Sequence, residues 1–260
     1  MNKHTYSLHK TVTLLFLGLF SLLSSCNDPA APTTPKKAAV IFTFDDTNIE
    51  SWYNNRDLFE QYNIKATFFL SHPEWMSSTM LNQLHELLQA GHEVACHTIN
   101  HLNALDYLES HTLEEYINTE IIRAKDTMVT LGFAPKTFAM PYGLSNNTID
   151  QEILKHFSRI RSATQNYNNT TLDQIDEIFY KWDGNLVPNA MGIDVFYNIS
   201  IANLTNGLER AKNNQEVIIF YAHKIDDSGN NFTTSRAYLE AAFQAANQLK
   251  LESIRFGDLN

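Results

Sequence analysis

The chain has 260 residues, of which 43% are hydrophobic, and its formal net charge is -10 at neutral pH. This length is enough for one domain with a large apolar core. The negative charge argues against a nucleic-acid-binding protein and against a protein held on a membrane by basic surface residues.

The first 25 residues are typical of a bacterial secretory signal. Lys3 and Lys10 accompany an almost wholly apolar stretch, residues 11–23, that is too short for a comfortable membrane span. The following LLSSC resembles a bacterial lipoprotein box, in which the cysteine is lipid-modified and becomes the first residue. We therefore expect cleavage after residue 25 and anchoring in the bacterial cell envelope through lipidated Cys26, on a membrane and face that the sequence leaves open. An ordinary signal with an incidental cysteine is the alternative.

Residues 26–37 (CNDPAAPTTPKK) are rich in proline, alanine and threonine and have nothing to bury. They predict a tether between the anchor and a single domain over residues 38–260. The only other cysteine, Cys96, ends an apolar run and is predicted to be a small buried hydrophobic residue. If Cys26 carries lipid, no disulfide can form within the mature chain, and the domain depends on packing for its stability.

The predicted domain opens with a β-branched and aromatic run, residues 38–44, that indicates a buried strand ending in two acids, Asp45 and Asp46. Neighbouring side chains on a regular strand point to opposite faces. Two acids that serve one site must therefore lie where the strand ends.

Strand and helix patterns then alternate along the chain. Further strands are expected at residues 64–70, 93–96, 136–140, 159–163, 217–221 and 253–256, with one or two short strands within 176–200. Helices are expected at residues 49–62, 77–88, 112–131, 145–157, 201–212 and 234–249. This alternation predicts an α/β fold of parallel strands surrounded by helices. A closed or nearly closed barrel is the first expectation, and an open doubly wound sheet is the alternative.

Polar clusters follow four of these predicted strands: Asp45-Asp46, His97 with His101, Pro141-Tyr142-Gly143, and His223. Since parallel strands of a barrel end at one mouth, we expect the clusters to converge there. Two imidazoles and one carboxylate that leave a position for water are a common catalytic zinc arrangement. The two histidines, four residues apart, would face the same way if their loop turned helically.

Four motifs in this order resemble those of the polysaccharide deacetylase family, of the NodB-homology type: TFDD (43–46), HTINH (97–101), MPYG (140–143) and the strand-terminal His223. The resemblance covers residues 38–260. It implies a distorted (β/α) barrel of about seven parallel strands. It also implies a divalent metal held by Asp46, His97 and His101, with zinc as first choice and cobalt, nickel or manganese as alternatives.

The same resemblance implies the catalytic roles. Asp45 would be the general base, His223 the general acid, and the backbone N–H of Tyr142 a donor to the oxyanion. These roles match what hydrolysis of an acetyl group needs: activation of water, stabilisation of charge on the carbonyl oxygen, and a proton for the leaving amine.

The chain departs from the family pattern at several positions. Thr47 stands where a glycine usually follows the two acids, and Ala139 stands where an arginine usually orients the base. Arg159 or Arg161, on the neighbouring predicted strand, could substitute for that arginine. These departures bear on rate and substrate more than on the metal site.

Three further residues are expected to shape the substrate pocket. Tyr221 replaces a leucine two residues before the acid His and would narrow or polarise the pocket for the acetyl methyl group. Trp182 is the nearest candidate for the family's substrate-binding tryptophan, with core or loop packing as the alternative. Pro141 lies beside Tyr142 in the motif, although a plain turn at a strand end also explains it.

The sequence thus predicts a metal-dependent hydrolase that removes N- or O-linked acetyl groups from an envelope or extracellular polysaccharide or oligosaccharide. We expect a monomer that contacts the membrane through lipidated Cys26 and binds no nucleic acid. Two alternatives stay open. One is a non-catalytic carbohydrate-binding lipoprotein that retains the metal site, and the other is a metal-dependent amidohydrolase for a small amide.

Overall fold

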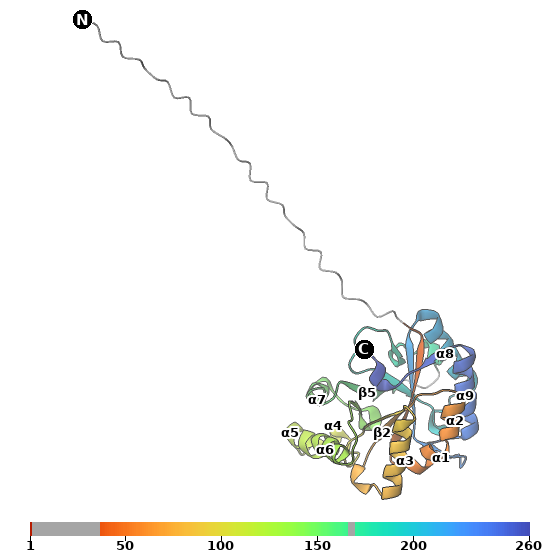
Figure 1. Ribbon diagram of the computed structural model, residues 1–260, viewed down its shortest axis with the longest axis horizontal. Coiled ribbons are helices and arrows are strands. Elements are labelled where there is room, and N and C mark those ends of the chain that lie inside the picture. The colour runs from red at the N-terminus through yellow and green to blue at the C-terminus, as the bar shows by residue number, and fades with distance from the viewer. Residues whose placement is uncertain (2–36, 166–169) are drawn as a thin grey trace. The chain divides into compact units, whose positions relative to one another are not determined.

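The computed structural model describes Met1 and residues 37–165 and 170–260 (Figure 1). Apart from Met1 and Lys37, the predicted signal peptide, Cys26 and the tether lie outside these residues and stay predictions. Residues 37–260 fall in one compact unit. None of the helices in this described part has the length and apolar character that crossing a bilayer would require.

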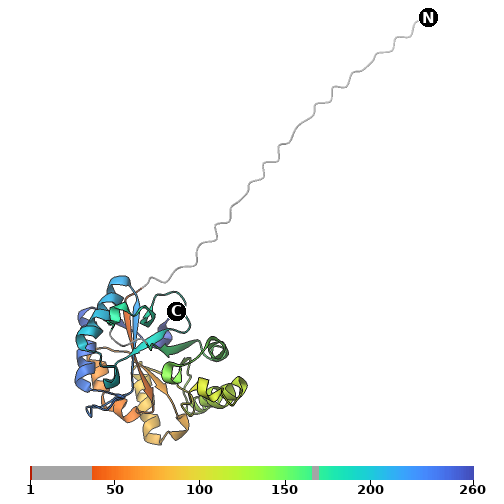
Figure 2. The ribbon, with the colours of Figure 1, turned by 180° about the vertical axis from the view of Figure 1, so that it is seen from behind.

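Within the described residues, seven parallel strands close into a barrel (Figures 1 and 2). In barrel order they are β1 (Ala39–Asp46), β2 (Thr67–Leu70), β3 (Glu93–Cys96), β4 (Thr137–Ala139), β5 (Arg159–Ala163), β7 (Asn189–Gly192) and β8 (Val217–Ala222). Pairing of β8 with β1, from Ala39 opposite Val217 to Phe44 opposite Ala222, closes the ring. The barrel is confirmed, and the open doubly wound alternative is wrong.

The barrel is distorted at the amino-terminal ends of its strands. There β1 pairs with the short β11 (Glu252–Ser253), and only its second half, from Thr43 onward, pairs with β2. The antiparallel β6 (Phe179–Tyr180) similarly runs beside the start of β8. The ring of seven is therefore complete only toward the carboxyl ends of the strands.

Helices surround the barrel (Figures 1 and 2). They are α1 (Ile49–Asn54), α2 (Arg56–Gln61), α3 (Ser78–Gln89), α4 (Ala104–Tyr107), α5 (Leu113–Tyr116), the π-helix η2 (Ile117–Ile122), α6 (Arg123–Thr130), α7 (Asn147–Ile153), α8 (Ile201–Asn214) and α9 (Arg236–Gln248). Short 3-10 turns lie at η1 (Pro73–Trp75), η3 (Pro141–Gly143), η4 (Leu172–Gln174), η5 (Asp176–Ile178), η6 (Val195–Tyr197) and η7 (Phe256–Asp258). A small parallel pair, β9 (Lys224–Ile225) and β10 (Thr233–Thr234), follows β8.

Local sequence signals explain several helix ends. Ser77 caps α3, and Thr112 with Glu115 forms a reciprocal capping box on α5. The single helix predicted over residues 49–62 is wrong, because Asn55 interrupts it and donates its side-chain amide to Ser51 O at 2.8 Å. The next predicted cap is displaced by one residue, since Asn146 rather than Ser145 caps α7.

Two apolar layers position the site. The outer layer, between barrel and helices, is rich in aromatic side chains such as Phe42, which packs edge-on to Phe243 with ring centroids 4.8 Å apart. The inner layer, inside the barrel, combines small and aliphatic residues with aromatic ones. Phe256 and Leu259 belong to the part of it that fills the amino-terminal end of the barrel. Because side chains alternate along β1, the strand that packs Phe42 outward carries Asp45 inward, toward the open end.

Candidate active site

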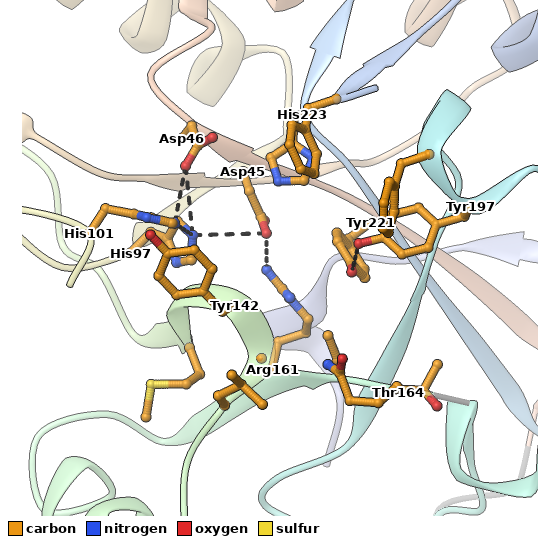
Figure 3. Close-up of a pocket in the computed structure, with 17 residues that line it drawn as sticks. Asp45, Asp46, His97, His101, Tyr142, Arg161, Thr164, Tyr197, Tyr221 and His223 are labelled. Atoms are coloured by element: carbon orange, nitrogen blue, oxygen red, sulfur yellow. Dashed lines mark hydrogen bonds and ion pairs between the residues drawn. The ribbon is translucent and has the colours of Figure 1, made fainter. Parts of the chain in front are cut away.

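The two acids that end β1 reach one pocket because the backbone turns between them. Asp46 has φ 78°, a left-handed conformation that is rare for a residue other than glycine, and it lies at the last position of the strand. Figure 3 shows both carboxyl groups directed toward the same cluster of side chains. The expectation that the strand must break its alternation at this point is confirmed.

The two histidines of HTINH converge through a loop that is not helical. Thr98 and His101 both have positive φ, 68° and 55°, and Thr98 Oγ1 accepts a hydrogen bond from His101 N at 2.9 Å. The loop therefore does not make the helical turn that would align the two side chains. The two left-handed residues nonetheless bring His97 Nε2 within 3.1 Å of His101 Nε2.

The donor atoms around these histidines fit a metal ion. His97 Nδ1 lies 2.8 Å from Ala139 O, a pure acceptor, so Nδ1 carries the proton and Nε2 presents its lone pair. Asp46 Oδ1 is 3.4 Å from His101 Nε2 and 3.9 Å from His97 Nε2. Burial lowers the pKa of His97 to about 4, against the pull of Asp45, and also lowers that of His101. Two neutral imidazoles and a carboxylate at this spacing suit a divalent cation.

A buried glutamate holds the loop between His97 and His101. Glu120 is only 1% exposed and lies in the π-helix η2, a kind of helical irregularity that is frequent at functional sites. Its carboxylate accepts hydrogen bonds from Asn100 N at 3.0 Å and Asn100 Nδ2 at 2.6 Å. Its backbone oxygen accepts from Ile99 N at 3.1 Å. Sequence analysis missed this residue, whose only signal is an acid on the buried face of a helix.

Asp45 is paired with a buried arginine. Arg161, 1% exposed, donates from Nη2 to Asp45 Oδ2 and lies opposite Ala139 in the β4–β5 register. The other oxygen, Asp45 Oδ1, is buried and accepts no hydrogen bond from the residues that the structure describes. Burial acts to raise the pKa of Asp45, but Arg161 and nearby histidines hold it below the usual value. The other candidate arginine, Arg159, points toward the amino-terminal end of the barrel, where it donates to Leu259 O at 3.2 Å.

The acid candidate His223 is held by Asp194, a residue that sequence analysis missed. Asp194 Oδ2 lies 2.6 Å from His223 Nδ1, and Oδ1 accepts from His223 N at 3.2 Å and from Thr234 Oγ1 at 2.7 Å. Burial opposes the charged form of His223, but Asp194 outweighs it and raises the pKa of His223 to about 9. With Nδ1 engaged, Nε2 is the nitrogen available to the pocket.

A pocket of about 430 Å³ joins these groups at the carboxyl end of the barrel. Seven predicted site residues line it: Asp45, Asp46, His97, His101, Tyr142, Tyr221 and His223. Pro141 is buried and is not among the lining residues, so it shapes the turn rather than the surface of the pocket.

Trp182 does not belong to this pocket. Its Nε1 donates to Lys37 O at 3.0 Å and its ring packs edge-on to Tyr180, 5.7 Å between centroids. Tyr180 pairs with Val217 at the start of β8, so Trp182 lies at the opposite end of the barrel. The prediction that Trp182 contributes to the substrate pocket is therefore wrong, and the alternative prediction of a packing role agrees with its contacts.

Two tyrosines differ in their placement at the pocket. Tyr142 has φ 60°, is 58% exposed, and packs edge-on to His101 with centroids 4.9 Å apart (Figure 3). Tyr221 is buried and its hydroxyl is hydrogen-bonded to that of Tyr197. The Arg161 guanidinium lies over the Tyr221 ring, 4.8 Å from its centroid. Where the resemblance implies a leucine, this chain thus has a tyrosine whose hydroxyl is bonded to Tyr197.

Comparisons with known proteins agree with this architecture. Residues 32–158 match the sequence model of a family described as polysaccharide deacetylase. A peptidoglycan-N-acetylglucosamine deacetylase of Bacillus cereus is 35% identical over 109 residues, 41% of this chain and 37% of that protein. A bifunctional xylanase/deacetylase of Pseudobutyrivibrio xylanivorans is 30% identical over 137 residues, 52% of this chain and 22% of that protein. The chain thus spans well under half of either relative.

The fold extends the likeness beyond the matched segment. The solved chitin deacetylase of the fungal pathogen Colletotrichum lindemuthianum superposes with a TM-score of 0.60 and 15% identity, over 86% of this chain and 88% of that one. Arg161, Asp194 and His223 follow the sequence match, which ends at residue 158. They lie on β5, after β7 and after β8, in the part of the barrel that follows the matched segment.

Proposed function

We propose that this chain, which matches the polysaccharide deacetylase family over residues 32–158, hydrolyses acetyl groups on an acetylated polysaccharide or oligosaccharide with the help of a divalent metal. One observation carries the proposal. Asp45 is a buried carboxylate with one oxygen paired to Arg161 and the other accepting no hydrogen bond from the described residues. A buried acceptor without a partner is costly in a purely structural position. It is what a general base beside a metal site requires.

Asp46, His97 and His101 would hold the metal. Zinc is the first choice because two neutral imidazoles and one carboxylate are a donor set it prefers, and cobalt, nickel and manganese are the alternatives. When bound, the metal would lower the pKa of a coordinated water and polarise the acyl carbonyl.

The remaining steps fall to side chains of the protein and to one backbone group. Asp45 Oδ1 takes a proton from the attacking water, and Arg161 keeps that carboxylate ionised. His223 Nε2 then gives a proton to the departing nitrogen as the carbon–nitrogen bond breaks, which releases acetate and a free amine. Asp194 fixes the ring and keeps it protonated at neutral pH. Tyr142, in its left-handed conformation at the pocket, supplies its backbone N–H to the oxyanion.

The substrate we propose first is an N-acetylated amino sugar within a polymer. The names of several relatives, which are peptidoglycan-N-acetylglucosamine deacetylases, support this choice. The two acid–base pairs, Asp45 with Arg161 and His223 with Asp194, support turnover over the alternative of a carbohydrate-binding protein without activity. We also propose, from the N-terminal sequence alone, attachment to the bacterial envelope through lipidated Cys26.

Release of acetate tests the proposal. The purified protein is incubated with N-acetylglucosamine tetramer, peptidoglycan and acetylated xylan, with and without a chelator and with zinc restored. We expect acetate from at least one substrate, loss with chelator and recovery with zinc. Asp45→Asn should retain zinc and lose turnover, by about 10²–10⁴-fold for removal of a general base. If Asp45→Asn releases acetate at the wild-type rate, the mechanism is wrong.

A further inference from the structure

Two phenylalanines that the mechanism does not use lie on the rim of the catalytic pocket. Phe196 is 46% exposed and Phe232 is 56% exposed, and both line the pocket. Their rings stack, with centroids 5.9 Å apart and planes at 28°. Single exposed apolar side chains are ordinary, but an exposed apolar pair at the edge of a pocket is typical of a ligand-binding surface.

The loops that present these rings also hold the acid. The loop after β7 carries Asp194 and Phe196, and the loop after β8 carries His223 and Phe232. Phe196 N donates to Asn231 O at 2.9 Å and joins the loops. Phe232 packs edge-on to His223, with centroids 5.4 Å apart. The two rings are therefore tied to the loops that hold the acid.

The position of the acid determines which part of the substrate meets the rings. The nitrogen that receives the proton from His223 belongs to the sugar, so the sugar ring lies on the His223 side of the scissile bond. Tyr142 stands by His101, across Asp45 from His223 (Figure 3). The mouth of the pocket is thus bounded by Tyr142 on the metal side and by the two phenylalanines on the acid side.

We propose that Phe196 and Phe232 form a stacking platform for a pyranose ring of a β-linked N-acetylhexosamine chain, at or next to the unit that loses its acetyl group. The proposal depends on the function proposed above. Equatorial substituents leave a face of C–H groups on such a sugar, which packs against the negative face of an aromatic ring. Continuity of the platform with the catalytic pocket favours the polymer over another protein as its occupant.

Binding of N-acetylglucosamine tetramer tests the platform without turnover. Calorimetry is done on zinc-loaded protein carrying Asp45→Asn, with Phe232→Ala, Phe196→Ala, both together, or Phe232→Tyr. We expect Kd to rise about tenfold in the double variant, comparable to the loss of one aromatic contact. Phe232→Tyr, which keeps the ring, should bind within about twofold of its parent. Leu186→Ala is the matched control, because Leu186 is 45% exposed and its oxygen accepts from Ile160 N at the start of β5, away from the pocket.

The outcomes separate the platform from the proposed activity. If the wild type releases acetate but the alanine variants leave Kd and KM unchanged, the platform is wrong and the activity stands. If Kd depends on the rings but no substrate yields acetate, the platform stands and the activity is wrong. Absence of tetramer binding would overturn the platform, as would a dimer in sedimentation that Phe232→Ala dissociates. If Phe196→Ala proves unfolded in thermal melting, the test uses the Kd values of Phe232→Leu and Phe232→Tyr alone. A weaker Kd for Phe232→Leu than for Phe232→Tyr supports the platform, and equal values overturn it.

Discussion

The two sides of the pocket hold their polar groups in different ways. On the metal side, two neutral imidazoles and the Asp46 carboxylate face one another, with His97 Nε2 and His101 Nε2 3.1 Å apart. On the acid–base side, each titrating group is paired with an opposite charge: Asp45 with Arg161, and His223 with Asp194. In the proposed function a bound cation completes the first side, whereas ion pairs within the chain hold the second. Chelation should therefore act on one side and pH on the other.

The largest expected effect removes the metal side alone. His97→Ala deletes a ligand, so we expect loss of bound zinc, measured by elemental analysis after dialysis, and loss of acetate release. The acid–base side should persist, since Asp194 and not the metal holds His223. Titration of the His223 ring by NMR, in wild-type and variant proteins both stripped of metal, should give a similar raised pKa. A variant that binds zinc with wild-type affinity would contradict the assigned ligand set.

The second prediction concerns the more buried of the two ion pairs, Asp45 with Arg161. Arg161→Ala leaves the Asp45 carboxylate buried without its cation, which should cost about 3–5 kcal/mol of unfolding free energy. It should also raise the pKa of Asp45, because the guanidinium holds that pKa down. Denaturant unfolding measures the loss of unfolding free energy. The raised pKa of Asp45 should appear as a shift of the acidic limb of kcat/KM to higher pH. Arg159→Ala is the control, since Arg159 does not contact Asp45 and should leave that limb in place.

The third prediction uses the other pair. The pKa of His223, about 9, exceeds the ordinary value of a histidine, so its proton stabilises the fold at lower pH and is lost as pH rises through that pKa. Activity should fall over the same interval, because the acid loses its proton. Asp194→Asn removes the charge responsible, and we expect the alkaline limb of kcat/KM to move down by roughly two pH units. A limb that stays in place would show that His223 is not the group titrating there.

The same contrast explains what the sequence could predict. The metal side follows a local motif: His97 and His101 are four residues apart, and Asp46 ends the strand that opens the domain. The barrel was predicted equally well, since six of its seven strands and most helices have a clear periodicity, and only β7 lies in the poorly patterned stretch 176–200. On the metal side, the loop shape between the histidines differs from a helical turn, because two left-handed residues replace it.

The acid–base side needed the fold. Asp194 lies in the least patterned stretch of the chain and meets His223 only because β7 and β8 are neighbours. Arg159 and Arg161 point to the same face of β5, so alternation could not choose between them, whereas the register that sets Arg161 opposite Ala139 does. Trp182 was assigned to the wrong end because nothing in the sequence shows that β6 runs antiparallel beside β8.

The smallest expected effect concerns Glu120, which holds the loop between His97 and His101. Glu120→Gln keeps the size of the side chain but cannot accept from both Asn100 N and Asn100 Nδ2 through charged oxygens. The loop between the two histidine ligands should loosen, and zinc affinity in chelator competition should fall by about 10–100-fold, as for outer-shell partners of other metal sites. At saturating zinc, kcat should remain within a few-fold of wild type, and the alkaline limb set by His223 should not move. Glu114→Gln, on the exposed face of α5, controls for loss of a charge from this region. An equal fall in both variants would mean that net charge, and not the clamp on the loop, sets the affinity.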